Sequence, residues 1–178
     1  PGLIDAHCHS TFDEVQSNDE LFFHRPATTA ALVTAFNMPK LLRAGVTSFF
    51  DPDTVDGIGP QVRDALDAGV FAGPRMATGV QALLTSVGGT AGRLIPDHGG
   101  VGYAAVVSTI DEMVTMTRRH VKQGADWIKI ATTGGVNSRI GSGLGPQMFP
   151  AEARAIAETD HLYAKKGAVR AHGADSIT

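Results

Sequence analysis

The sequence contains very little cysteine and lacks any long hydrophobic run. Its single cysteine, Cys8, cannot form a disulfide within the chain, so nothing requires an oxidising compartment and we expect a cytoplasmic protein. No stretch of about 18 apolar residues occurs, and no basic segment is followed by a short apolar one. The sequence therefore predicts neither a membrane span nor a signal peptide.

An excess of either charge is also absent. Lysine and arginine together number 15 against 18 aspartates and glutamates, which gives a formal net charge of -3. So weak a field would not attract nucleic acid or anionic lipid, and we expect neither partner. The composition, with 43% hydrophobic and 19% charged residues, is that of a folded protein, and we expect one domain over residues 1–178.

Short apolar segments with β-strand character alternate along the chain with longer helix-like segments. We expect strands at Leu3–Ala6, Val46–Phe50, Val70–Met76, Trp127–Ile130 and Ala168–Ala171. We expect helices at roughly Thr29–Arg43, Gly59–Leu66, Thr109–Lys122 and Ala151–Lys165. Glycines expected to cap these helices in the left-handed conformation are Gly45, Gly69, Gly124 and Gly167. The alternation predicts an α/β fold in which helices connect the strands of a parallel sheet.

The expected connections are unequal in length. Links from helix to strand are short, whereas three links from strand to helix are long: Ser10–Thr28, Ala77–Ser108 and Ala131–Pro150. All three leave the carboxyl ends of parallel strands, where barrel and open-sheet enzymes place their sites. Long loops in a compact fold usually carry function, so we expect a functional site at this end.

Two histidines stand two residues apart where the first expected strand ends, in the run His7-Cys8-His9. Side chains alternate along a strand, so His7 and His9 would point to one face while Cys8 packs on the other. Two imidazoles on one face can bind a divalent ion, and Asp5 on the same face could orient one of them. The same spacing suits histidines that only form hydrogen bonds in a core, so both interpretations stay open.

Two further candidate residues lie in or after later strands. Lys129 sits in an otherwise apolar strand, and a buried lysine is costly unless it extends to solvent, pairs with a carboxylate, reacts, or is modified into a metal ligand. His172 follows the last expected strand and shares a face with Arg170, although a structural histidine would look the same. Three arginines could each bind a substrate carboxylate: Arg93, Arg139 and Arg170.

Three segments in this order resemble signatures of the amidohydrolase superfamily, a group of metal-dependent hydrolases on a (β/α)8 barrel. The run from Pro1 to His9 is similar to the family's strand-1 signature, and Ala44-Gly45-Val46-Thr47 is similar to its strand-2 entry. The segment from Gly124 to Ile130 resembles its strand-4 segment. Within the superfamily, the chain resembles the branch of Xaa-Pro dipeptidases, related carboxypeptidases and imidazolonepropionase-like enzymes. The resemblance implies a partial TIM barrel of strands 1 to 5 with intervening helices.

The resemblance also implies metal ligands and a reaction. His7 and His9 would hold one ion, Lys129 would be carboxylated on its amine and bridge two ions, and a strand-5 histidine would hold the second. We take that histidine to be His172, although alignment on the following glycine would put Arg170 there. The implied cofactor is one or two divalent ions, zinc first. The implied reaction is hydrolysis of an amide or peptide-type C–N bond in a small or dipeptide-like substrate by a metal-bound hydroxide.

The resemblance covers only part of a barrel. The family's strand-6 histidine and its strand-8 aspartate, the proton shuttle, would lie beyond Thr178, so no catalytic acid or base is assigned. Full barrels need about 250 residues, and we expect the remainder of a barrel or a homo-oligomer to complete the sheet. Two alternatives stay open: an inactive barrel fragment or binding module, and a barrel enzyme that uses Lys129 as a Schiff-base amine.

Overall fold

Strands and helices alternate along the chain, in a computed structural model that describes residues 1–89, 102–135 and 145–177. The strands are β1 (Leu3–Asp5), β2 (Val46–Asp51), β3 (Arg75–Thr78), β4 (Ala82–Leu84), β5 (Ala104–Val106), β6 (Trp127–Ala131) and β7 (Lys166–Arg170). The α-helices are α1 (Ala27–Arg43), α2 (Gly59–Asp67), α3 (Ile110–Gln123) and α4 (Pro150–Leu162). Short helical turns lie at Glu20–His24, Val55–Gly57 and Ala174–Ser176.

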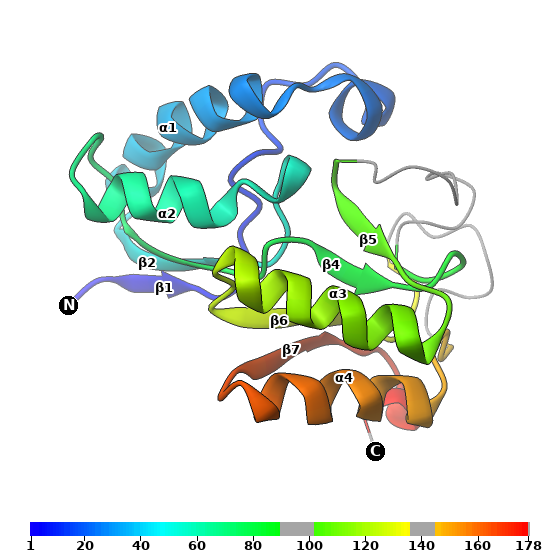
Figure 1. Cartoon of the computed structure of the whole chain (residues 1–178). Helices are drawn as coiled ribbons and strands as arrows, with labels where there is room; N and C mark the ends of the chain where they lie inside the picture. Colours follow the sequence, from blue (N-terminus) through cyan, green and yellow to red (C-terminus); the bar gives the residue numbers. More distant parts are fainter. Residues whose placement is uncertain (90–101, 136–144, 178) are drawn as a thin grey trace.

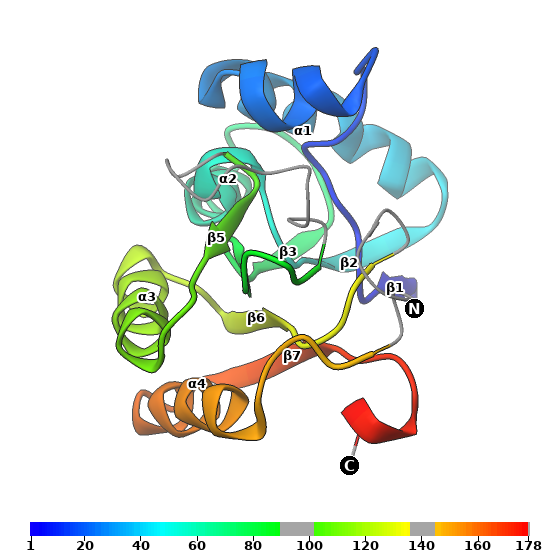
Figure 2. The ribbon, with the colours of Figure 1, turned by 90° about the vertical axis from the view of Figure 1, so that its right-hand side faces the viewer.

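The strands form a curved wall whose helices lie on the outer side. Figure 1 shows α1 and α2 beside the first strands, and α3 and α4 beside the later ones. After a quarter turn, the four helices lie around one side of the strands (Figure 2). Every strand pair is parallel, as the alternation predicts. None of the helices in the described ranges combines the length and the apolar character that a membrane-spanning helix needs.

The wall is made of two short sheets that meet in the middle. One sheet has the strand order β1-β2-β3 and the other β5-β4-β6-β7. Only three residues separate β3 from β4, and the Asp126 amide donates a 2.9 Å hydrogen bond to the Thr78 carbonyl across the junction. β3 and β4 are therefore two parts of one broken wall strand, between β2 on one side and β6 on the other. β5 pairs only with β4 among the described strands, so it is an additional strand beside the second part of this broken strand.

The break in this strand centres on Gly79 and Val80. Val80 has a φ of 67°, a conformation that a β-branched residue rarely adopts. Its amide donates to the Thr78 hydroxyl at 3.1 Å, and its carbonyl accepts from the Thr54 amide at 2.9 Å. These hydrogen bonds hold Val80 in the strained conformation. The third wall strand therefore changes direction where it passes the loop after β2.

The expectation of a strand at Val70–Met76 is wrong in its position. Gly69 ends α2 with a φ of 71°, as predicted, but the chain does not become extended until Arg75, after Pro74. Proline lacks the amide that a central strand needs, so pairing with β2 begins only beyond it. The three-residue strands β4 and β5 were not predicted, because the connection Ala77–Ser108 shows no apolar alternation long enough to reveal them.

The expected glycine cap after the last helix is also wrong. Gly45 and Gly124 adopt the predicted positive φ, at 83° and 100°. After α4, however, Ala164 has a φ of 54° and takes the left-handed position, while Gly167 lies inside β7. β7 therefore begins two residues earlier than the predicted strand at Ala168–Ala171, a shift that leaves the alternation of its side chains unchanged.

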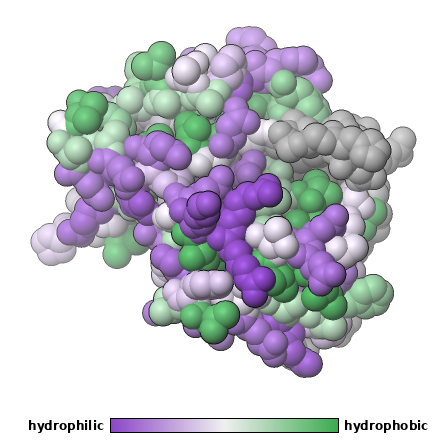
Figure 3. Space-filling view, viewed as in Figure 1, coloured by the Kyte–Doolittle hydropathy of each residue, from purple (hydrophilic) through white to green (hydrophobic). Residues whose placement is uncertain are grey.

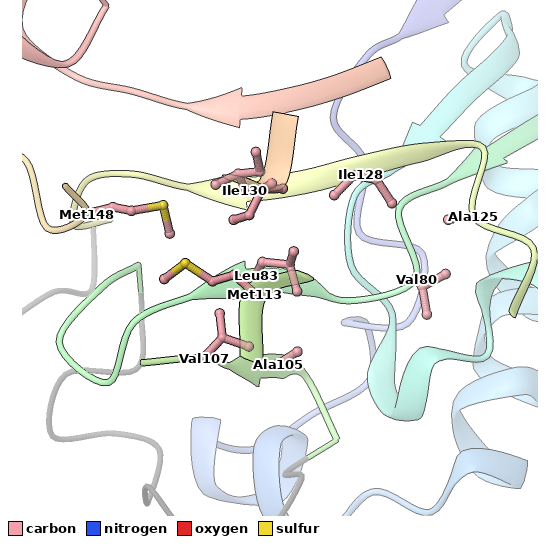
Figure 4. Close-up of a cluster of buried hydrophobic side chains, with 10 residues drawn as sticks. Val80, Leu83, Ala105, Val107, Met113, Ala125, Ile128, Ile130 and Met148 are labelled. Atoms are coloured by element: carbon pink, nitrogen blue, oxygen red, sulfur yellow. The ribbon is translucent and has the colours of Figure 1, made fainter. Parts of the chain in front are cut away.

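Apolar side chains fill the space between the wall and its outer helices. Leu83 and Ile128, on β4 and β6, pack against Met113 of α3 and Ile156 of α4, and the four are fully buried. Figure 4 shows the strand residues of this cluster converging on Met113. A second cluster, which includes Met38 of α1, packs α1 and α2 against β2 and β3. Hydrophilic side chains gather over the outward face of α3 (Figure 3), as expected for a helix packed on one side.

Candidate metal centre

The two histidines lie where the chain leaves β1. The strand ends at Asp5, whose carboxylate accepts a 3.0 Å hydrogen bond from the His7 amide and turns the chain. Cys8 donates its amide to the Phe50 carbonyl at 2.9 Å, and its side chain packs against the cluster that contains Met38. The turn therefore preserves the predicted arrangement: the thiol packs against the outer helices, and the two histidines face the same space.

The imidazoles of His7 and His9 converge through their Nε2 atoms, which lie 3.2 Å apart. Two nitrogen ligands of one tetrahedral ion, each about 2.0–2.1 Å from the metal, lie about 3.3 Å apart. The rings meet edge to face at 81°, so the two nitrogens approach the shared point from different directions. The pair fits a divalent ion as two of its ligands.

Asp53, which follows β2, fixes the orientation of His9. Its Oδ1 lies 2.8 Å from His9 Nδ1, and the side chain of Asp53 is only 4% exposed. The ring of His9 also stacks on Phe12, with centroids 4.2 Å apart and planes 4° from parallel. Burial alone would lower the pKa of His9, but the contact with Asp53 raises it on balance. A proton held on Nδ1 leaves the Nε2 lone pair free for a metal, the arrangement common in metal-binding histidines.

Sequence reasoning missed Asp53 and gave the orienting role to Asp5, which instead contacts a backbone amide. The contact between His9 and Asp53 joins residues 44 positions apart, just beyond the ends of β1 and β2. A signal was present in Asp51-Pro52-Asp53, two carboxylates at the carboxyl end of an expected strand. Adjacent strands of a parallel sheet bring such ends together, so the pairing could have been anticipated.

A buried polar network lies behind the histidine pair. Asp51 Oδ2 accepts from the Ser10 amide at 2.9 Å and from the Ser10 hydroxyl at 2.5 Å. The amide of Asn37, on α1, donates to the Ser10 carbonyl at 3.0 Å. Complete burial raises the pKa of Asp51 to about 7, although the hydrogen bonds from Ser10 oppose the shift. The network ties the residue directly after His9 to both β2 and α1.

Lys129 lies on β6 at the same end of the wall and is only 4% exposed. Burial lowers its pKa, while the nearby Asp53 carboxylate opposes that shift. Burial and the positive charge of Lys129 also lower the pKa of His7, so the two side chains are close enough to interact. Within the described ranges, Lys129 forms no ion pair or side-chain hydrogen bond. The structure therefore brings Lys129 to the histidine pair, as predicted, but does not extend it to solvent.

Arg170 and His172 lie at different places relative to this site. Arg170 is the last residue of β7, and its guanidinium packs on Gly135, where any added Cβ would collide with Nη1. Its charge acts on Lys129 and on His7. His172 lies beyond the end of β7 and is exposed. Ligation by His172 stays a prediction.

Some expected residues lie outside the described ranges, namely Arg93 and Arg139. Among the described residues, no group of three His, Cys, Asp or Glu side chains is arranged to hold a metal. The donor set of the described residues is thus two converging imidazoles, one of them oriented by a carboxylate, with a buried amine close by. This set suits a divalent ion whose remaining ligands come from elsewhere.

Known proteins share both the sequence pattern and the fold. Ochratoxinase of Aspergillus niger is 28% identical over 198 residues, which cover 96% of this chain and 40% of that protein. Its crystal structure matches 99% of this chain with a TM-score of 0.85 and 26% identity. A Xaa-Pro dipeptidase with methionine bound in its active site matches 99% of this chain and 44% of its own, with a TM-score of 0.82 and 29% identity.

These likenesses confirm the predicted partial barrel, with the wall order β1, β2, β3/β4, β6 and β7. The chain spans less than half the length of each of these relatives. The model of the amidohydrolase family matches residues 1–176, nearly the whole chain. The motifs at the ends of β1 and β6, the fold and this match agree, and the chain belongs to the amidohydrolase family.

Proposed function

We propose that this chain forms part of the active site of a metal-dependent hydrolase that cleaves an amide or peptide-type C–N bond. The observation that carries the proposal is the convergence of His7 and His9 Nε2 at 3.2 Å, with Asp53 behind His9. The family and the similarity to a Xaa-Pro dipeptidase favour a small, dipeptide-like substrate. The single cysteine and the near-neutral charge favour a cytoplasmic protein without nucleic acid or membrane partners.

In this function, His7 and His9 hold a divalent ion, for which zinc is the first candidate. When bound, the ion would lower the pKa of a water molecule and polarise the scissile carbonyl. Asp53 keeps the His9 ring in the tautomer that presents Nε2. The Ser10–Asp51 contact holds the chain after His9, so both rings approach the ion from fixed directions.

Lys129 is proposed as a further ligand after carboxylation of its amine. The unmodified ammonium is buried and unpaired among the described residues, which is costly. A carbamate would replace this buried cation with anionic oxygen donors. A free amine that forms a Schiff base stays the alternative, and trapping with borohydride in the presence of a carbonyl substrate would reveal it.

The inner side of the wall also indicates that further structure packs there. A pocket of about 360 Å³ opens on the inner face, lined mainly by apolar side chains such as Ile4, Phe50 and Trp127. Ile4 is 75% exposed and Trp127 is 42% exposed. β1 and β7 each pair on one side only among the described strands. We propose that the rest of a barrel, or a second copy of the chain, covers this face.

The test measures metal content in the complete natural protein. We expect bound divalent metal in the parent, and its loss in His7→Ala and in His9→Ala. The matched control is His161→Ala, because His161 is an exposed histidine on the outer helix α4. Unchanged metal content in both site variants would sink the proposal. A protein that binds metal but cleaves no dipeptide would support the other function, that of a binding module.

A further inference from the structure

We propose that Arg170 stands in place of a second metal ion, so that the site binds one divalent ion only, at His7 and His9. This inference rests on the proposed function. The residues around His7 and His9 fit an ion, whereas those around Lys129 and Arg170 do not fit a second one. The resemblance implies a site with two metal ions, but the side chains around Lys129 and Arg170 do not provide ligands for the second ion.

The register of β7 places Arg170 on the inner face of the wall. β6 and β7 pair with Lys129 opposite Ala168 and with Ala131 opposite Arg170. Ala168 lines the inner pocket, and side chains two residues apart on a strand share a face. Arg170 therefore faces inward one step nearer the carboxyl end than Ala168. From this position on β7, the charge of Arg170 acts on the neighbouring Lys129 of β6.

The extent of β7 supports the same assignment. Ala164 takes the left-handed position that ends α4, and the strand begins only two residues later. Counting every second residue from this start gives Lys166, Ala168 and Arg170 on one face, and β7 ends at Arg170. His172 would be next in the count, but it lies beyond the paired strand and is exposed.

The chemistry of Arg170 opposes a second ion. A guanidinium carries five donors, no acceptor and a permanent charge, so it cannot coordinate a metal. A divalent ion beside it would be repelled, more strongly because Lys129 is buried and water screens the charges weakly there. The nearby carboxylate, Asp53, is already engaged with His9. The guanidinium thus supplies the second positive charge that another ion would otherwise bring.

Gly135 gives Arg170 a defined place. The guanidinium packs against this residue so closely that any side chain there would collide with it. The guanidinium has neither a carboxylate partner nor a hydrogen bond to any described residue. Arg170 is held by packing at the mouth of the site, with its charge available there.

The experiment counts metal ions per chain in the complete natural protein, by elemental analysis and by the number of resonances after loading with cadmium-113. We expect one ion and one resonance in the parent, no change in His172→Ala, and two of each in Arg170→His. The control for the new histidine is Arg154→His, because Arg154 is an exposed arginine on α4; it should keep one ion.

Two ions in the parent, or loss of one in His172→Ala, would overturn the inference and support ligation by His172. A count of one in Arg170→His would also overturn it, because the position would then not be a ligand position. Failure of the proposed function looks different, since the parent would hold no ion, or His7→Ala and His9→Ala would leave the count unchanged.

Discussion

The two halves of the wall treat their buried polar side chains differently. Behind β1 and β2, buried groups contact one another: Ser10 with Asp51, His9 with Asp53, and Asn37 with the backbone. Around β6, β7 and their outer helices, the buried side chains of His120 and Lys129 contact no polar group among the described residues, and buried Asp160 has only a 3.6 Å contact with the exposed His161. A buried group with partners costs little, whereas one without them lowers stability.

The difference separates a prepared site from an incomplete one. In the first half, His9 has a defined orientation before any ligand arrives, which favours metal binding. In the second half, Lys129 and Arg170 face inward, and neither forms an ion pair with a described carboxylate. We infer that the first half determines where the ion binds, and that the second half determines what binds beside it.

The largest effect is expected at Gly79, where the two halves meet. A Cβ at this position would collide with the Pro52 carbonyl oxygen and lie 3.0 Å from Lys129 Cβ. Gly79→Ala should therefore lower the free energy of unfolding by about 3 kcal/mol, as overpacking against backbone does. Urea denaturation measures the change. Gly145→Ala is the control, because nothing lies within 4 Å of its added Cβ; equal effects of the two would contradict the prediction.

The second-largest effect tests the half of the wall around β1 and β2, where the buried polar groups contact one another. Asp53→Asn removes the charge beside His9 and should weaken metal binding by about 10- to 100-fold, as losses of such orienting carboxylates do. Competition with a chelator measures the affinity. Asp56→Asn is a matched control, since Asp56 is an exposed carboxylate in the same loop. An affinity unchanged in Asp53→Asn would show that the orientation of His9 does not depend on this contact.

The third effect tests the half of the wall around β6, β7 and their outer helices. Burial lowers the pKa of His120 to about 4, and neither ring nitrogen has a partner among the described residues. The unfolded chain binds a proton near pH 6.5, so stability is unaffected above that value and falls as the pH drops toward 4. We expect the parent to lose about 2 kcal/mol more stability between pH 8 and pH 5 than His120→Leu does. Comparing the two proteins removes the opposite contribution of Asp51, whose pKa burial raises to about 7.

Thermal unfolding at both pH values measures this dependence. The control is His24→Leu, because His24 is exposed and its replacement should leave the loss at acid pH in place. If His120→Leu lost as much stability at pH 5 as the parent does, the buried imidazole would not be its source.

The smallest effect concerns Asp160 on α4, which is 1% exposed. Burial raises its pKa, so its ionisation costs stability at neutral pH, and the cost disappears as the pH falls toward that of the free carboxyl. Asp160→Asn should therefore stabilise the protein at pH 7 by less than about 1 kcal/mol. Urea midpoints of this variant and of Glu158→Gln, a change at an exposed site, would show the gain; a clear loss in Asp160→Asn would show that the contact with His161 outweighs the cost of burial.

The order of the helices and strands could be predicted from local patterns, but the positions where strands start late or are interrupted could not. Apolar runs and glycine caps at Gly45, Gly69 and Gly124 placed the helices within a few residues. The third strand was misplaced because Val70 and Phe71 are apolar, although Pro74 delays pairing. A left-handed valine and a left-handed alanine, at Val80 and Ala164, are decided by tertiary contacts and have no local signal.

The same limit applies to the candidate site. The convergence of His7 and His9 follows from spacing within one segment, so the sequence was sufficient to predict it. The contact with Asp53 joins the segments that follow two different strands, and the inward position of Arg170 depends on the pairing of β7 with β6. Both required a register, which a single sequence specifies only weakly.

The break at Gly79 and Val80 also bears on how such a protein can change during evolution. The part of the third wall strand before the break takes its register from β2, and the part after it takes its register from β6. Insertions between β4 and β5 therefore act on the second part alone. The connection between β4 and β5 can lengthen or diverge while the segments that carry His9 and Asp53 stay in place, so this part of the chain can vary without loss of the metal-binding pair.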